Sequence, residues 1–440
     1  MPENFAALMV DGHRMLPALL EDIASAKHSI HLSMFLFFRD PIGEEVADAL
    51  RRRAQAGVAV RVLLNVEKTA MGDPFSTGER EMMRHDPAVD YDPTDVKPMC
   101  LKLRAAGVLV QDTNIDYDRE LPGLNPRLQS IAQQLRGGIS VDDMHVDHRK
   151  IVLVDGRVAW CGGANIGAQY MYHVPFDPQK DARAEGEERK LAQLPEPWWK
   201  WHDSLTRFEG PVAVAIEQHF HERWVLDGGE DYAPIAVTSG DGPPRGRPLR
   251  DARVYSNEPN ARPNDVRELY LRLIREARRS IFLENPYLYH PQIADALCAA
   301  KAARPDLDVV LVVPSGRHND NSYGQDAQEH EYARYLQAGI AVHEYANHFT
   351  HLKMAVFDER FSIHGSTNLN CRSLEDDKDF ELVVLVDDEP LARWVLAHVR
   401  DVDVANARRI VDQDLHGTLA GLRRRVRDPR TLAMLAKRVL

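Results

Sequence analysis

The amino-acid sequence predicts an α/β protein of two similar α/β/α lobes, each with a mixed, mainly parallel sheet. Three observations support this prediction. Each half of the chain alternates helical and strand-like patterns, the halves repeat each other in the same order, and each half ends on a copy of one polar motif. Strands that alternate with helices are typical of sheets that helices cover on both faces.

The internal repeat begins in each half with an amphipathic helical pattern that leads into an apolar strand. Similar segments follow in the same order: residues 26–32 match 277–283, 46–50 match 293–297, and 106–110 match 338–342. Each half is therefore expected to run helix, strand, helix, strand, helix, strand, and then the motif.

Insertions and a linker explain the unequal lengths of the halves. The matching segments lie farther apart in the chain at the start of the repeat than at the motifs, so the first half carries the larger insertions. Residues 66–98 and 113–140 fit as these insertions, and 226–250 is a Pro/Gly-rich linker. The predicted lobes are residues 1–225 and 251–440.

Charge and cysteine usage narrow the class of protein. The formal net charge is -12 and the pI about 5.9, which argues against nonspecific binding of nucleic acid and against broad adhesion to anionic membranes. The scattered cysteines show no metal-ligand spacing and favour a reducing compartment. The sequence shows no secretory signal and no apolar run of about 20 residues that could span a membrane, so we expect a cytoplasmic protein.

The polar motif H-x-K-x4-D occurs twice. Its copies consist of His148, Lys150 and Asp155, and of His351, Lys353 and Asp358. Alternate residues of an extended strand face the same side, so the His and Lys of each copy point together. One H-x-K is weak evidence, because a surface His near a Lys is common. Two copies at the same place in a long repeat are difficult to obtain by accident, and they indicate a functional site.

The agreement continues beyond the motif. Asn165 and Asn368 lie at the same distance after their motif histidines, and each follows a short segment that holds Gly163 in the first copy and Ser366 in the second. Glycine permits close backbone approach, and asparagine supplies an amide donor. These four residues are candidates for binding the non-bridging oxygens of a phosphate. The exchange of Gly163 for Ser366 predicts unequal roles for the halves.

On these motifs nearly the whole chain resembles the phospholipase D superfamily, whose active site is made by two such motifs at the interface of two lobes. The resemblance implies that one histidine attacks phosphorus to form a phosphohistidine, while the other protonates the leaving alcohol and then activates water or an acceptor alcohol. By this analogy His148 is the nucleophile, His351 is the general acid and base, and Lys150 and Lys353 stabilise charge. A near-symmetric site could reverse the histidines. No cofactor is implied.

Each histidine needs a group that fixes its tautomer. In the first half, residues 201–203 resemble the family's Trp-x-Asp element, and Asp203 is the candidate. In the second half, residues 379–381 resemble its Asn-Phe-Glu element, and Glu381 is the candidate. A solvated carboxylate is the alternative for both.

Two further features of the motif regions have structural explanations. Asp155 and Asp358 belong to the motif, but a role in the turn after each motif strand fits them better than catalysis. His145 and His348 each lie three residues before a motif histidine, and such a pair could suggest a metal. No helix and no third ligand supports that interpretation, so we expect no metal site.

Within the superfamily, the chain looks most like bacterial cardiolipin synthases, on residues 33–43, 56–61, 148–166 and 365–374. This resemblance implies transfer of a phosphatidyl group to an alcohol acceptor, with a phospholipid such as phosphatidylglycerol as substrate. The alternatives are a hydrolase of phospholipid or nucleic acid, and a non-catalytic binder of phosphates. The complete motifs argue against the last, the acidic charge argues against nucleic acid, and no protein partner is evident.

Membrane contact is expected to be peripheral, on the inner face of the cell membrane. Trp198, Trp199 and Trp201 cluster beside Lys200, a composition that suits the lipid interface, although packing around Asp203 explains it equally well. Residues 423–440 could form a basic amphipathic helix on anionic lipid. The alternative is a solvated helix that packs one face on the lobe.

Overall fold

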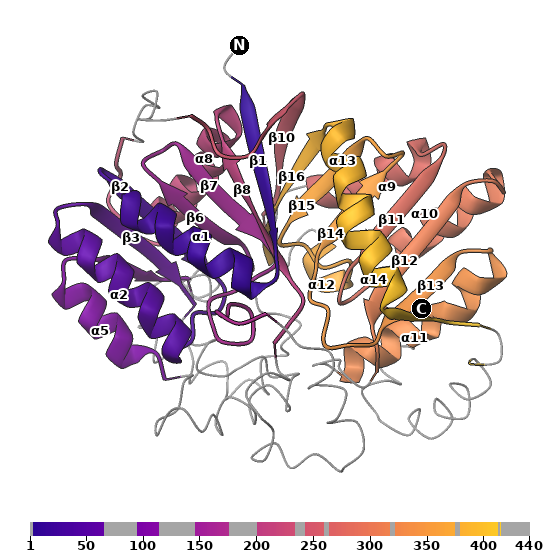
Figure 1. Cartoon of the computed structure of the whole chain (residues 1–440), viewed down its shortest axis with the longest axis horizontal. Helices are drawn as coiled ribbons and strands as arrows, with labels where there is room; N and C mark the ends of the chain where they lie inside the picture. Colours follow the sequence, from indigo (N-terminus) through magenta and orange to yellow (C-terminus); the bar gives the residue numbers. More distant parts are fainter. Residues whose placement is uncertain are drawn as a thin grey trace, which may run out of the picture.

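The computed structural model describes most of both halves of the chain: residues 3–65, 95–113, 146–175, 200–233, 243–258, 264–316, 322–374 and 379–411, with Asp414. The predicted C-terminal helix at 423–440 and most of the two predicted insertions lie outside these residues. The two halves form two lobes that lie side by side (Figure 1).

The first lobe contains, within the described residues, a sheet with the strand order β4-β3-β2-β6-β7-β8-β1-β9. Its elements in chain order are β1 (Asn4–Val10), α1 (Gly12–Ser25), β2 (Ser29–Met34), α2 (Pro41–Gln55), β3 (Ala59–Leu64), α5 (Lys97–Ala105), β4 (Leu109–Asp112), β5 (Val146–Asp147), β6 (Lys150–Val154), β7 (Val158–Gly162), β8 (Ser204–Glu209), α8 (Pro211–Leu226) and β9 (Arg247–Leu249). Apolar side chains of α1, α2 and α5 pack in one hydrophobic cluster, and those of α8 pack in another.

The second lobe repeats this plan with the strand order β10-β16-β15-β14-β11-β12-β13-β17. Its elements are β10 (Asp251–Asn257), α9 (Asp265–Glu276), β11 (Ser280–Glu284), α10 (Pro291–Ala303), β12 (Asp308–Pro314), α11 (Ser322–Gln337), β13 (Ala341–Tyr345), β14 (Met354–Phe357), β15 (Phe361–Gly365), α12 (Cys371–Leu374), β16 (Asp379–Asp387), α13 (Glu389–Val395), the π-helical turn η5 (Leu396–Arg400), α14 (Asp401–Ala405) and β17 (Ala407–Arg409).

The predicted mixed α/β fold is confirmed, and the parallel pairing is concentrated in one region of each sheet. Strands β2, β3 and β4 are parallel, as are β11, β12 and β13. The motif strands β6 and β14 instead form hairpins with β7 and β15, and the pairs that follow are antiparallel. The parallel part is smaller than expected because the tight turn after each motif strand permits only an antiparallel return.

The motif aspartates occupy these turns. Asp155 and Asp358 both have a φ of 54°, in the left-handed region that aspartate tolerates better than most residues. The carboxylate of Asp155 accepts backbone N–H bonds of residues 27–29 at 2.7–2.9 Å, and that of Asp358 accepts those of residues 278–280 at 2.7–3.1 Å. Each aspartate therefore anchors the start of the neighbouring strand.

The predicted linker contributes a strand to the first sheet. Within it β9 pairs with β1, and Pro248 lies opposite Phe5. The next strand, β10, pairs with β16 of the second sheet. The chain therefore changes lobes between Leu249 and Asp251.

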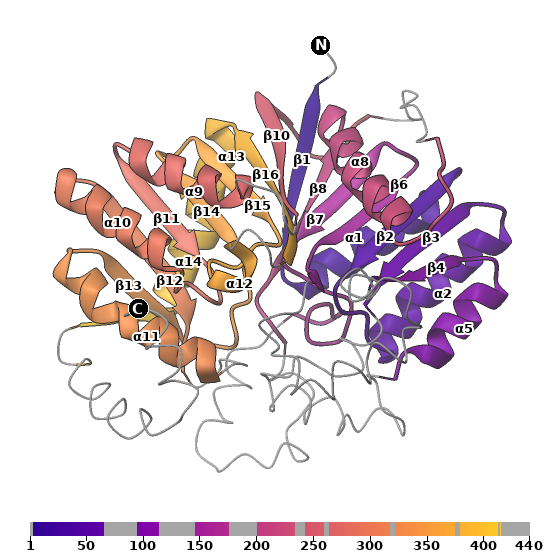
Figure 2. The same ribbon diagram turned by 180° about the vertical axis from the view of Figure 1, so that it is seen from behind.

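The lobes share a hydrophobic core along their interface. One apolar cluster combines buried side chains of both halves, among them Ile151, Phe208, Leu352 and Val384. Strands β1, β8, β10 and β16 lie at the centre of the molecule in both views (Figure 2). The short strand β5 of the first lobe also pairs with β16 of the second. In the part of the chain that the structure describes, no helix combines the length and hydropathy required to cross a bilayer.

Candidate active site

Each motif histidine is held by a carboxylate of the opposite lobe. Nδ1 of His148 lies 2.9 Å from Oε1 of Glu381, and Nδ1 of His351 lies 2.7 Å from Oδ2 of Asp203. All four side chains are buried. An imidazole that donates through Nδ1 to a carboxylate is fixed in orientation and presents the lone pair of Nε2. Each acid follows the motif of its own half in the chain, so the sequence order does not reveal this exchange between the lobes.

The backbone beside each pair also crosses the interface. The N–H of His148 donates to the carbonyl of Phe380 at 3.0 Å, and the N–H of His351 donates to that of His202 at 2.8 Å. A parallel bridge joins Thr350 to His202, as β5 joins β16 in the other half. His202 and Phe380 therefore occupy equivalent positions, each directly before the carboxylate that holds a motif histidine.

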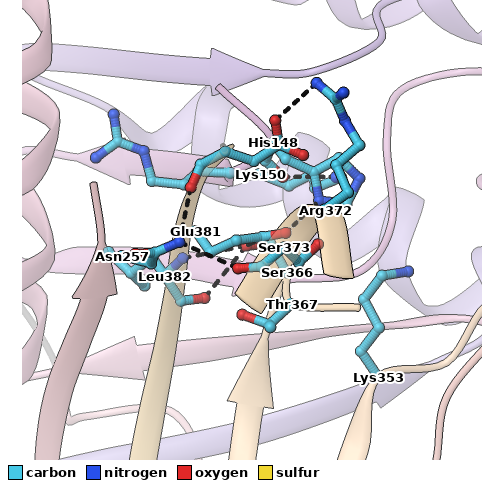
Figure 3. A network of polar contacts seen from close by, with 12 residues as sticks. His148, Lys150, Asn257, Lys353, Ser366, Thr367, Arg372, Ser373, Glu381 and Leu382 are labelled. Carbon is cyan, nitrogen blue, oxygen red and sulfur yellow. Dashed lines mark hydrogen bonds and ion pairs between the residues drawn. The ribbon is translucent and has the colours of Figure 1, made fainter. Parts of the chain in front are cut away.

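The two motif lysines are buried beside the histidines. Nζ of Lys150 donates to the carbonyl of His148 at 2.6 Å and lies 5.1 Å from the ring centroid of Phe35. Nζ of Lys353 donates to the carbonyl of His351 at 2.9 Å and lies 3.0 Å from its Nε2. Figure 3 shows His148 and Lys150 beside the side chains of the second lobe, with Lys353 in the same view.

Burial and positive charge keep both histidines neutral. Burial, followed by the charge of Lys150, lowers the pKa of His148 to about 4 in spite of the Glu381 carboxylate. Burial and the charges of Lys353 and Lys150 lower the pKa of His351 well below its ordinary value. Burial and the charge of Lys353 also lower the pKa of Lys150 to about 7. The site therefore holds two neutral imidazoles in a positive surrounding.

The two carboxylates differ from each other. Burial raises the pKa of Asp203 to about 7, although the charges of Lys353 and Lys150 oppose this shift. Burial also acts to raise the pKa of Glu381, but the contact with His148 and the charge of Lys150 more than offset it, and the pKa falls below its usual value. Glu381 is therefore fully ionised at neutral pH, whereas Asp203 titrates near it.

The difference between Gly163 and Ser366 follows from the lengths of these acids. A Cβ on Gly163 would lie 2.3 Å from Oδ1 of Asp203, so the shorter aspartate already fills the place of a side chain. The longer Glu381 leaves room for Ser366, whose hydroxyl donates to Oε2 of Glu381 and accepts the N–H of Leu382 at 3.2 Å. The Ser366 hydroxyl is therefore bonded on both sides, and the space beside Gly163 is occupied by a carboxylate. Contact of Ser366 and Gly163 with phosphate stays a prediction.

The two motif asparagines have different surroundings. Oδ1 of Asn165 accepts the N–H of Leu36 at 3.0 Å, which orients its amide nitrogen away from that backbone group. Oδ1 of Asn368 is buried and has no hydrogen-bond partner among the described residues. Both amides are buried near the motif strands, and their role in phosphate binding stays a prediction.

Aromatic rings surround the histidines, and sequence reasoning missed most of them. The ring of Phe35 lies 4.9 Å from that of His148, centroid to centroid. Three ring centroids lie 5.2–5.8 Å from that of His351: those of Trp201, Tyr170 and Phe349. Trp201 is buried, so this member of the predicted tryptophan cluster packs in the core, while residues 198–199 lie outside the described part. Phe35 belongs to the segment 33–43 that resembles cardiolipin synthases, but nothing in that resemblance indicated a contact with His148.

Three groups of described residues have ligand atoms close enough to hold a metal ion. They are Asp11, His202 and His348; His202, Glu284 and Asp403; and His219, Glu222 and Glu258. His202 belongs to two of them. Its Nδ1 lies 2.8 Å from Oδ1 of Asp11 and its Nε2 lies 3.2 Å from Oδ2 of Asp403, so a ring with a proton on each nitrogen satisfies both carboxylates. His145, the other histidine considered for a metal, lies outside the described residues.

Comparisons with known proteins point to one family. A family model described as "Cardiolipin synthase, PLD-like domain" matches residues 19–175 and 270–402. The chain is 24% identical over 412 residues to cardiolipin synthase 2 of Staphylococcus epidermidis. The aligned region covers 92% of this chain and 69% of that relative. It is 24% identical over 403 residues to the major cardiolipin synthase ClsA of Bacillus subtilis, with 91% and 69% covered.

Solved structures of low sequence identity share the fold. A phosphatidylserine synthase of Haemophilus influenzae matches with a TM-score of 0.58 and 12% identity, over 97% of this chain and 96% of that one. A polyphosphate kinase of Porphyromonas gingivalis matches with a TM-score of 0.51 and 13% identity, over 93% of this chain and 49% of that one. The family model matches both halves of the chain, and each half carries one copy of the motif. The chain therefore belongs to the family of cardiolipin synthase, PLD-like domain proteins.

Proposed function

We propose that the chain is a phosphatidyltransferase of the cardiolipin synthase type that works through a phosphohistidine. One observation carries the proposal: two neutral histidines, His148 and His351, are each oriented by a carboxylate of the other lobe beside two buried lysines. Nucleophilic catalysis needs a neutral imidazole, and acid–base catalysis needs a second group that can exchange a proton.

In the first half-reaction, Nε2 of His148 attacks phosphorus while the P–O bond to the leaving alcohol breaks. His351 gives a proton to the departing oxygen. The negative charge of a bound phosphodiester raises the pKa of the nearby His351, so substrate binding itself favours the protonated form. Lys150 and Lys353 stabilise the charge that develops on the phosphoryl oxygens.

In the second half-reaction, the hydroxyl of an acceptor alcohol gives its proton to the now neutral His351. The acceptor oxygen bonds to phosphorus, the P–N bond breaks, and Nε2 of His148 regains its lone pair. The cycle consumes one phosphodiester and one alcohol and produces another pair of the same kinds.

The carboxylates support the assignment of His148 as nucleophile. Glu381 has a lowered pKa and stays ionised, so it can stabilise the positive charge that the His148 ring gains in the phosphohistidine. Asp203, with a pKa of about 7, is matched to a histidine that gains and loses a proton in each cycle.

Phosphatidylglycerol is the proposed substrate, as donor and as acceptor, because relatives over most of the chain are named cardiolipin synthases. The products are then cardiolipin and glycerol. Since both substrates are lipids, we propose that the protein works in peripheral contact with a membrane, on its cytoplasmic face.

The test is to incubate the purified protein with phosphatidylglycerol that carries label in its glycerol headgroup and, separately, in its acyl chains. Labelled cardiolipin together with released glycerol is the expected outcome. Phosphatidic acid without cardiolipin would instead identify a hydrolase, in which water resolves the phosphohistidine. No turnover of lipid, with cleavage of single-stranded DNA, would refute the lipid assignment.

A further inference from the structure

His202 forms a second link between the lobes, directly behind the acid–base histidine. Its Nδ1 contacts Asp11, at the end of β1 in the first lobe, and its Nε2 contacts Asp403, on α14 of the second. Its carbonyl accepts the N–H of His351, and the next residue, Asp203, holds the ring of His351. The ring of His202 is thus joined to both lobes, and its backbone is joined to both members of the Asp203–His351 pair.

The pseudo-twofold relation shows that this link is not required by the fold. The equivalent residue in the other half is Phe380, whose ring lies under the guanidinium groups of Arg149 at 5.2 Å and Arg223 at 4.2 Å. There the positive charges stack on an apolar ring, and Asp147 binds Arg149. At the equivalent place behind His351, the ring of His202 itself makes the polar contacts. An apolar residue satisfies the backbone geometry, so the imidazole of His202 has a further purpose.

The helix that carries Asp403 is adapted to this contact. The π-helical turn η5 comes directly before α14 and inserts one residue, which rotates the following side chains by about 100° relative to a regular helix. Asp403 is 1% exposed whereas its neighbour Val402 is 49% exposed. Burial of apolar surface would give the reverse arrangement, so α14 is placed to deliver a carboxylate to His202.

The groups around the His202 ring favour a positive charge on it. Asp11 and Asp403 contact its nitrogens, Tyr345 stacks on its face at 5.2 Å, and His348 meets it edge-on at 6.0 Å. Burial opposes the charged form, but the two carboxylates raise the pKa of His202 well above its ordinary value.

One more acid lies beside this group and is expected to be neutral. Burial and the charge of Asp403 raise the pKa of Glu284 well above its ordinary value. Oε1 of Glu284 accepts the hydroxyl of Thr350 at 2.6 Å. When Glu284 is protonated it carries no charge. Asp11 and Asp403 are then the two negative groups beside the His202 ring, and a positive ring compensates their charge.

We propose that His202 is a positioning residue: as an imidazolium bound to Asp11 and Asp403, it favours the ionised form of Asp203 and keeps this carboxylate aligned with His351. Acid–base catalysis then depends on a charged contact that spans the two lobes. This inference rests on the proposed phosphatidyl transfer and extends it, because it names a residue that never touches substrate and acts through Asp203.

The test compares His202→Gln and Asp403→Asn with the control Asp401→Asn, a 56% exposed carboxylate on the same short helix. Steady-state transfer from phosphatidylglycerol in mixed micelles is measured from pH 5.5 to 9. Both test variants should lower kcat by about 10- to 100-fold with KM within about twofold, since the lost contact acts on a catalytic pair and not on lipid binding. Without the positive charge next to it, Asp203 is harder to ionise, so the acid limb of the profile should move to higher pH by about 0.5–1 unit. Asp401→Asn should match the wild type.

Three results would overturn the inference. The first is an unshifted acid limb in a folded His202→Gln variant. The second is a neutral His202 ring at pH 7.5 in the wild-type chain, measured by ¹⁵N NMR of histidine-labelled protein, a readout that stands even where Asp403→Asn fails to fold. The third is one equivalent of divalent metal in the purified wild type that His202→Gln loses, which would make His202 a metal ligand. A wild type that transfers no phosphatidyl group would refute the proposed function instead, and the NMR result would still decide the state of His202.

Discussion

Oε1 of Glu381 in the second lobe lies 2.9 Å from Nδ1 of His148 in the first, and the other oxygen of the same carboxylate accepts the hydroxyl of Ser366. The reciprocal pair, Asp203 with His351, has no such hydroxyl, because Gly163 stands in that place. The two motif histidines therefore share one arrangement and differ in their surroundings.

The roles of the two histidines can be separated with a substrate that has a good leaving group. In His351→Ala, transfer from phosphatidylglycerol should fall by about 10²–10⁴-fold, because the leaving alkoxide receives no proton. The first turnover of phosphatidyl-p-nitrophenol should release p-nitrophenol at a rate within about tenfold of the wild type, since that leaving group needs no acid. Later turnovers should stay slow, because the second half-reaction still lacks its base. His148→Ala should be inactive on both substrates.

The same experiment decides the order of the two histidines. Rescue of His148→Ala by the p-nitrophenyl substrate, with no rescue of His351→Ala, would assign the nucleophile to the second lobe. Trapping the phosphohistidine by acid quench and locating it by peptide mapping gives an independent answer.

Activity should have a narrow, bell-shaped dependence on pH. The pKa of Asp203 is about 7, and only its ionised form orients His351, so kcat/KM should rise as the pH increases toward 7. The pKa of Lys150 is also about 7, and the loss of its charge should lower kcat/KM as the pH increases further. In Lys150→Arg the alkaline limb should disappear below pH 9, because guanidinium stays charged. An unchanged alkaline limb in that variant would assign it to another group.

The ionised carboxylate of Asp203 should lower the free energy of unfolding, although catalysis depends on it. Its pKa in the folded chain, about 7, lies above that of an unfolded aspartate, so its protonated form favours folding at low pH. This contribution is lost as the pH rises through the folded pKa. Asp203→Asn should therefore be more stable than the wild type at pH 8, by roughly 1–3 kcal/mol, and about equally stable near pH 4, where much of the unfolded aspartate is protonated. Denaturant unfolding at the two pH values tests this, and equal effects at both would contradict it.

The space beside each carboxylate predicts that a substitution at Gly163 is much more harmful than one at the equivalent Ser366. Gly163→Ala places a Cβ 2.3 Å from Oδ1 of Asp203, so the carboxylate is displaced from His351 and kcat should fall by about 100-fold or more. Ser366→Ala removes one donor to Glu381 and leaves its contact with His148, so the loss should be about tenfold, the cost of one hydrogen bond to a buried charge. A milder effect of Gly163→Ala than of Ser366→Ala would contradict this picture.

The motif aspartates should affect stability and leave the chemistry unchanged. Asp155→Asn keeps the left-handed turn but weakens the bonds to the backbone of residues 27–29. Unfolding free energy should fall by about 1–3 kcal/mol, with kcat per folded molecule unchanged. The control is Asp48→Asn, on a partly exposed side chain that pairs with Arg51 of the same helix. A large loss of kcat in folded Asp155→Asn would place this carboxylate in the mechanism.

The fold and the motif residues were predictable because the duplication displays them twice. Periodicity gave the helices and strands, and the repeated spacing singled out His148 and His351 from all other histidines. Contacts between the halves were not predictable, because the sequence lists Asp203 after the first motif and Glu381 after the second, and nothing in that order indicates the exchange. The contacts of Ser366 were missed for the same reason, since they depend on how far a carboxylate reaches in space.

The residues behind the site were hidden for a different reason. Asp403 lies far along the chain from either motif, on a helix whose register depends on the π-helical turn before it. A regular helical pattern gives no sign of that rotation. His202 is the unspecified residue of the Trp-x-Asp element, and only the structure shows what its ring contacts.

The reciprocal carboxylates have a consequence for inheritance. A substitution at Glu381 changes the second half of the chain but affects the motif histidine of the first half. A substitution at Asp203 changes the first half but affects the motif histidine of the second half. If one half is replaced by a diverged copy, the motif histidine of the other half meets a different carboxylate. The duplicated halves are therefore free to become different from each other, as Asp203 and Glu381 already are, but they can do so only together.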